Sequence, residues 1–183
     1  MKSLATNPTL TLPDGTSFEV VESDPESASA RIDFEITMAP DAIGPPRHIH
    51  LSQEESWTVL SGELSVQVDD GWRSLCAGDR LTVPPGTVHT LKNRSKETVR
   101  FRDVHLPALD FHEYIEDLDR LRASGKLSTR MTPRTLIYGA MVLVAHRPMQ
   151  LSASAPQRAA ESVLAIIGRA LGYRVPTRPP QVQ

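Results

Sequence analysis

Two different patterns of apolar residues divide the chain near residue 106. Before that point, short runs rich in Val, Ile, Phe and Thr often alternate with polar residues, which predicts β-strands separated by turns. The predicted strands cover residues 17–22, 30–37, 56–60, 63–68, 80–83 and 98–106. Many short strands at this spacing are typical of a β-sandwich or a β-barrel.

After residue 107 the apolar residues recur every three or four positions, which predicts helices. The first predicted helix begins with Asp110 and Glu113 in the positions of a capping box and ends at Gly125. A second helix is predicted over residues 132–146 and a third over residues 154–172. The fold class we expect is therefore mostly β, with a small α-helical extension at the C-terminal side.

These patterns predict three regions: a β-barrel over residues 1–106, a helical extension over residues 107–174 and a flexible tail over residues 175–183. Charge follows the same division. Residues 1–106 contain 10 Lys and Arg against 16 Asp and Glu, and residues 107–183 contain 10 against 6. The extension is thus net positive and the β region net negative, so we expect it to pack on the barrel of its own chain or of a neighbour.

Composition excludes several classes of protein. The net charge of −2 gives no support for binding to nucleic acid or to an anionic membrane. Cys76 is the one cysteine, so an intrachain disulfide is impossible. The first residues lack the apolar core of a signal peptide, and the longest apolar run, residues 136–145, is about half of the ~20 residues that a membrane span needs. We therefore expect a soluble cytoplasmic protein.

The segment HIHLSQEESW carries the first candidate chemistry. His48 and His50 are two residues apart, so in a strand their side chains point to the same side. Glu55 is five residues after His50, so in one continuous strand its side chain would point to the opposite side. A turn over residues 51–54 can change this orientation, and Glu55 then lies on the same side of the next strand as the apolar Trp57. A buried carboxylate needs a partner, and a metal ion held with the two imidazoles would provide one.

A second segment, GDRLTVPPGTVHTLKN, places His89 just after a turn at Pro85 and Gly86. A hairpin there brings His89 beside the first cluster. Together the two segments resemble the two motifs of the cupin family. The matching residues are His48, His50, Glu55 and Gly62 in the first motif, and Gly78, Pro84, Gly86, His89 and Asn93 in the second. The opening glycine of the first motif departs from the family spacing, because three residues separate Gly44 from His48, where the family usually has five.

The resemblance covers about residues 17–106 and implies a jelly-roll β-barrel with a metal bound by His48, His50, Glu55 and His89. Three histidines and one carboxylate suit Fe(II), Mn(II), Ni(II), Cu(II) or Zn(II). Four protein ligands leave one or two coordination positions open, which favours a catalytic or ligand-binding site over a structural one. Two further residues, Asp103 and His105, share a face with Phe101 and are expected at the pocket mouth, at the surface or in hydrogen bonds.

The function implied is a metal-dependent oxygenase that resembles the quercetinase-like dioxygenases and acts on a small chelating enol or phenol. Glu55 would be both a metal ligand and the catalytic base. The alternatives are a metal-dependent isomerase or decarboxylase, and a non-catalytic cupin that binds a small molecule. The apolar helix near residues 136–145 must be buried. We therefore expect the helices to pack against the barrel and against a second copy, which gives a homodimer. The alternatives are a lid over the pocket mouth and a position at a membrane surface, against which the near absence of basic residues beside the second helix counts.

Overall fold

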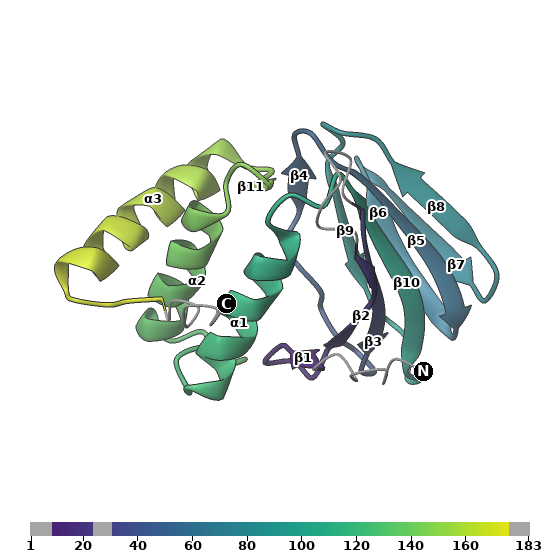
Figure 1. Ribbon diagram of the computed structural model, residues 1–183, viewed down its shortest axis with the longest axis horizontal. Coiled ribbons are helices and arrows are strands. Elements are labelled where there is room, and N and C mark those ends of the chain that lie inside the picture. Colours follow the sequence, from purple (N-terminus) through teal and green to yellow (C-terminus); the bar gives the residue numbers. More distant parts are fainter. Residues whose placement is uncertain (1–8, 24–30, 176–183) are drawn as a thin grey trace, which may run out of the picture.

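Alternating apolar residues give the strands a common buried face, and two antiparallel sheets enclose the core so formed (Figure 1). The structure is a computed structural model that describes residues 9–23 and 31–175. Within these residues, one sheet has six strands in the order β1 (Leu10–Thr11), β2 (Ser17–Ser23), β3 (Ile32–Met38), β10 (Val99–Leu106), β5 (Glu54–Ser61) and β8 (Arg80–Val83). The other has five, in the order β11 (Gln150–Ser152), β4 (His48–His50), β9 (His89–Lys92), β6 (Glu63–Val68) and β7 (Gly71–Cys76).

The predicted fold class, mostly β with a helical extension, is confirmed. The strands predicted over residues 63–68 and 80–83 coincide with β6 and β8, and the other predicted strands differ by one or two residues at their ends. The apolar pattern does not predict β1, β4, β7, β9 or β11, although the two candidate ligand segments placed the histidines of β4 and β9 on strands. Strand β7 is an edge strand with one buried residue, Leu75, so it lacks the alternation of a half-buried strand. Residue 30 of a predicted strand and residues 176–183 of the predicted tail lie outside the described residues.

Three helices lie beside the barrel: α1 (Phe111–Ala123), α2 (Pro133–Ala145) and α3 (Ala155–Ala170) (Figure 1). Helix α1 joins the barrel core through Phe111 and Ile115. Helix α2 packs between α1 and α3, with Val142 in the contact to α1 and Met141 in the contact to α3. As predicted, most apolar residues of α2 are buried. Each helix in the described part of the chain is too short or too polar to cross a bilayer.

The starts of the helices are close to the predicted positions, but one cap differs. Asp110 is the N-cap of α1, yet its carboxylate does not cap the first turn. Instead it accepts a hydrogen bond from Nδ1 of His146, at 2.6 Å, so the predicted capping box is wrong. In α3, Oγ of Ser154 accepts from the Gln157 amide as predicted, whereas the Gln157 side chain bonds elsewhere.

Strand β11 returns the chain from the helices to the barrel. It pairs with β4, with Gln150 opposite His50 and Ser152 opposite His48. Immediately afterwards, the amide of Ala153 donates to the carbonyl of Arg47 at 3.0 Å. The segment between α2 and α3 therefore forms the edge strand next to β4, the strand that carries two of the predicted metal ligands.

Candidate metal centre

The structure brings the four predicted ligands together. His48 and His50 lie on β4, and His89 lies opposite His48 on the neighbouring strand β9. Glu55, on β5 of the other sheet, points into the barrel from the opposite side, as the predicted change of facing requires. The amide of Gly86 donates to the carbonyl of His50 at 2.8 Å, so the turn of the second motif is fastened to the strand of the first.

Backbone carbonyls fix the tautomer of all three imidazoles. Nδ1 of His48 lies 2.9 Å from the carbonyl oxygen of Pro46, Nδ1 of His50 lies 3.1 Å from that of Met149, and Nδ1 of His89 lies 2.9 Å from that of Thr87. A carbonyl only accepts, so each Nδ1 carries the proton. The Nε2 atom of each neutral ring therefore presents a lone pair, which is the arrangement of a metal-binding histidine.

The potential ligand atoms of His48, His50, Glu55 and His89 all lie within 4.8 Å of one another. Oε2 of Glu55 is 3.1 Å from Nε2 of His50 and 2.9 Å from Nε2 of His89. These three atoms are buried, and none makes an aligned hydrogen bond with a described residue. Buried acceptors that face one another without protons are costly, and a divalent transition metal between them removes that cost. The donor set thus fits a metal ion.

Electrostatics favours a neutral His48 and an ionised Glu55, as metal binding needs, and acts in the opposite direction on His89, whose proton a metal ion must displace. Burial, together with His89 and His50, lowers the pKa of His48 to about 3, so this ring is neutral near pH 7. Burial would raise the pKa of Glu55, but the nearby His105 and His89 outweigh it and hold that pKa well below its ordinary value. For His89, burial is outweighed by Glu55, which raises the pKa of the ring.

Two more titratable residues, Asp103 and His105 on β10, are buried next to the cluster. Nε2 of His105 lies 3.3 Å from Oδ2 of Asp103 and 3.9 Å from Oε1 of Glu55. The His105 ring stacks on Phe111 of α1 with 3.6 Å between ring centroids. Burial raises the pKa of Asp103 to about 6. The sequence left open whether these residues lie at the surface. Their alternation with the apolar Phe101 was the signal that they point inward.

Comparison with known proteins agrees with this geometry. A sequence model of the family described as Cupin domain matches residues 34–105, the part of the chain that holds all four ligands. Residues 34–105 are a cupin domain. No curated protein matches the chain.

Solved structures show the same fold. KdgF from Halomonas sp. has 19% sequence identity and a TM-score of 0.51, over 58% of this chain and 91% of that protein. An RmlC-like cupin from Shewanella frigidimarina NCIMB 400 has 20% identity and a TM-score of 0.52, over 61% of this chain and 94% of that one. At these identities the similarity shows the fold alone, and it confirms the predicted cupin-type barrel.

Two motif residues of the cupin domain shape the backbone instead of binding metal. Asn93 donates from its side-chain nitrogen to the carbonyls of Ala39 and Glu97, at 2.9 and 2.7 Å, and so ties together two loops. Gly44 has a φ of +61°, and a Cβ atom there would lie 2.0 Å from the carbonyl oxygen of Leu91. Only glycine fits at position 44, so this residue keeps its structural role although its spacing from His48 differs from that of the family motif.

A cavity of about 580 Å³ leads from the surface to the metal-ligand cluster, where His48 and Glu55 form part of its wall. The barrel contributes the apolar side chains of one wall of this cavity, and α1 contributes those of the opposite wall. They include Phe18, Ile36 and Leu91 from the barrel and Phe111, Ile115 and Leu118 from α1. Helix α1 thus forms one side of the pocket of the cupin domain.

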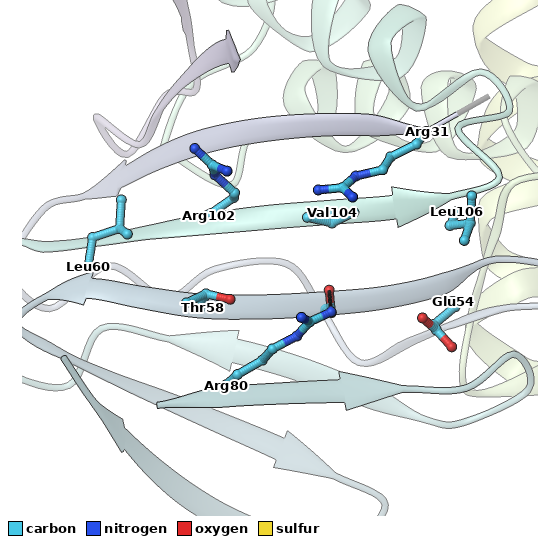
Figure 2. Close-up of a pocket in the computed structure, with 9 residues that line it drawn as sticks. Arg31, Glu54, Thr58, Leu60, Arg80, Arg102, Val104 and Leu106 are labelled. Carbon is cyan, nitrogen blue, oxygen red and sulfur yellow. Dashed lines mark hydrogen bonds between the residues drawn. The ribbon is translucent and has the colours of Figure 1, made fainter. Parts of the chain in front are cut away.

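A second cavity, of about 440 Å³, lies on the outer face of the six-stranded sheet. Figure 2 shows Arg31, Arg80 and Arg102 along this face, with Leu60 and Leu106 at its ends. Residues that alternate with the inward-facing Glu55 and Trp57 line it, so β5 and β10 separate it from the metal ligands. This outer groove contains none of the predicted site residues.

Proposed function

We propose that this protein binds one divalent transition metal through His48, His50, Glu55 and His89 and is an enzyme of the metal-dependent dioxygenase type. Its substrate is a small, neutral, largely apolar molecule with a chelating enol or phenol at one end. The observation that carries the proposal is the apolar cavity that ends at His48 and Glu55. It gives a substrate access to the two ligands and places its apolar body against α1.

The lining of this cavity determines which substrates fit. Among the described residues that line it there is no Lys or Arg, while Asp14, Asp41, Glu55 and Asp103 contribute carboxyl groups. A phosphate or a carboxylate substrate would find no cation in the pocket apart from the metal, and would face these acids. An apolar ring system is instead favoured by the aromatic and aliphatic walls.

The residues around the metal can orient the substrate and handle its proton. When bound, the metal polarises a coordinated substrate oxygen and offers the positions that four protein ligands leave open. Oε1 of Glu55 lies on the side of His105, and Oε2 lies between His50 and His89. Glu55 is therefore placed to take a proton from the chelating hydroxyl, and Asp103 with His105 is placed to receive that proton or to return it.

One observation favours a second candidate function. The Asp103–His105 pair stands beside the same pocket and can move a proton without any oxidant. A metal-dependent isomerase or decarboxylase would use such a pair together with the metal as a Lewis acid. A non-catalytic binding protein would need the apolar pocket and the four metal-binding residues, but not the Asp103–His105 pair.

The test begins with the metal content of the purified full-length protein, measured by mass spectrometry, and with loading by Fe(II), Mn(II), Ni(II), Cu(II) and Zn(II) in turn. Oxygen uptake is then measured with a panel of flavonols, diketones and catechols. Oxygen uptake that depends on the metal supports the dioxygenase. Conversion of these compounds without oxygen supports the isomerase or decarboxylase, and tight binding without conversion supports the binding protein. Failure to bind any metal would overturn all three.

A pocket variant separates substrate binding from metal binding. Replacing Leu118, a partly buried pocket residue on α1, with Lys places a cation beside the proposed apolar body of the substrate. We expect the KM for a neutral substrate to rise about tenfold or more, because the ammonium group must be desolvated, while the metal content stays unchanged. Leu60→Lys, in the outer groove, is the matched control.

A further inference from the structure

Helix α3 directs polar side chains of its first half toward its own protein. Glu161 is buried and accepts a hydrogen bond from Oγ of Ser152 at 2.5 Å. Arg158 donates to the carbonyls of Ser152 and Ala153, at 2.7 and 3.0 Å. These contacts fasten α3 to β11, so the polar side of the helix is used inside the fold. A helix at the surface of a protein ordinarily has the opposite orientation.

The solvent-facing side of α3 is apolar. Val163, Ile166 and Ile167 are 55%, 62% and 42% exposed, and Leu171, which follows the helix, is 65% exposed. The other exposed residues from 155 to 171 are Ala155, Pro156, Ala159, Ala160, Arg169 and Ala170. At about 100° per residue, the apolar members of this set cover an arc of about 160° with Val163 at its centre. Arg169 lies outside that arc, at its edge.

We propose that this face, from Ala155 to Leu171, binds the same face of a second copy of the chain in an antiparallel helix pair. The two-fold axis passes near Val163, which is the middle of the apolar surface both along the helix and around it. Figure 1 shows α3 as the helix farthest from the barrel, so two copies can meet here without a clash between their barrels. The proposal is independent of the function proposed for the metal centre.

The sizes of the side chains make this face complementary to itself. Its N-terminal half has small residues, such as Ala159 and Ala160, and its C-terminal half has large ones, such as Ile166 and Leu171. In an antiparallel pair, the large residues of one copy lie over the small residues of the other, and Val163 meets Val163. Positions 156, 159, 163, 166 and 170 follow the alternating three- and four-residue spacing of a helix–helix seam.

Charge also favours a second copy over other occupants. The centre of the face carries no charged residue, as is usual for the core of a protein interface, and no like charges oppose one another across the axis. A membrane surface would require basic residues along the edges of the face, and Arg169 is the exposed basic residue on α3. Each helix presents a length of about 24 Å to the other, enough for the central part of an ordinary dimer interface.

The first test is the mass of the full-length protein in solution, by analytical ultracentrifugation up to about 100 µM. We expect a dimer. Ile166→Glu places a charge at one of the seam positions, one turn from Val163, and should weaken association at least about 30-fold. Leu60→Glu introduces the same charge at an exposed leucine in the outer groove and should leave the dimer intact. A monomeric wild type, or a dimer that Leu60→Glu dissociates and Ile166→Glu does not, would overturn the proposal.

Cysteine cross-linking tests the antiparallel arrangement. Cys76 is exposed, so the variants are made in a Cys76→Ser background. Val163→Cys should form a disulfide-linked dimer under mild oxidation, because the two copies of position 163 meet at the axis. Ala155→Cys should not, because the two copies of position 155 lie at opposite ends of the pair. Cross-linking of Ala155→Cys and not of Val163→Cys would overturn the proposed register.

Discussion

The carbonyl of Met149 accepts a hydrogen bond from Nδ1 of His50 across 99 positions of sequence, with both groups buried. Met149 lies between α2 and β11, so a residue of the helical segment sets the tautomer and orientation of a predicted metal ligand. The helices are therefore connected to the metal centre at two places: through Met149, and through the α1 side of the pocket.

Leu151→Pro should lower metal affinity without removing a ligand. Leu151 lies in the middle of β11 opposite Ile49, and proline there breaks the pairing that holds Met149 against His50. Loss of a group that only orients a metal-bound histidine typically costs about 10–100-fold in affinity. Isothermal titration with Zn(II) measures the effect, and Leu151→Ala, which keeps the backbone pairing, is the control. Equal affinities for Leu151→Pro and wild type would show that β11 does not support the site.

His50→Ala or Glu55→Ala should abolish stoichiometric metal binding while the barrel stays folded. Each variant removes one of four converging ligand atoms, so the loss should exceed the roughly 100-fold seen when only the orientation of a ligand changes. His112→Ala is the matched control, because His112 lies on α1 and contacts Glu116 instead of the cluster. Metal content by mass spectrometry and circular dichroism give the two readouts. Unchanged metal content in both ligand variants would disprove the assignment.

His146 should stabilise the protein more in mild acid than in alkali. Its Nδ1 lies 2.6 Å from Asp110 and its Nε2 lies 3.1 Å from Asp117, whose carboxylate also pairs with Arg120. Burial would lower the pKa of His146, but Asp117 and Asp110 raise it above its ordinary value. The stabilisation is therefore complete below about pH 6.5 and disappears as the pH rises through the pKa of the folded state.

Denaturant unfolding of wild type and His146→Gln checks this dependence. At about pH 5.5 the variant should lose about 1.5–3 kcal/mol, the typical contribution of hydrogen bonds to a charged group, and at about pH 9 it should lose less. Burial would raise the pKa of Asp117, but His146 and Arg120 lower it. The Asp117 carboxylate therefore stays ionised, and keeps its contact with His146, until the pH falls well below about 4. A loss that is the same at both pH values would mean that His146 acts only by packing.

Gly44→Ala should destabilise the barrel much more than Gly15→Ala. Both glycines have positive φ, +61° and +85°, so an alanine at either position pays about 1–2 kcal/mol for the left-handed backbone. At Gly15 a Cβ atom meets nothing within 4 Å, whereas at Gly44 it would lie 2.0 Å from the Leu91 carbonyl oxygen. We expect a total loss of more than about 3 kcal/mol for Gly44→Ala. Similar thermal midpoints for the two variants would contradict this steric explanation.

The sequence by itself determined the elements and the identity of the ligands. Alternation located β6 and β8 to the residue, the three- and four-residue spacing located the helices, and two spaced motifs selected His48, His50, Glu55 and His89. This works because strand and helix periods, and the residue types that a metal prefers, are local properties of the chain. The same local rules failed for β7, which has too little buried surface to show a period.

Only the tertiary structure decided which distant residues meet. It paired β11 with β4, drew Asp110 away from the helix cap to His146, and placed Asp103 and His105 beside Glu55. Apolar periodicity shows that a face will be buried, but it does not show against what, because any apolar surface of suitable shape satisfies it. For the same reason the sequence showed that α3 is amphipathic, and only the fold revealed that Glu161 faces inward, together with Ala165 and Gly168, while Val163 and Ile166 face solvent.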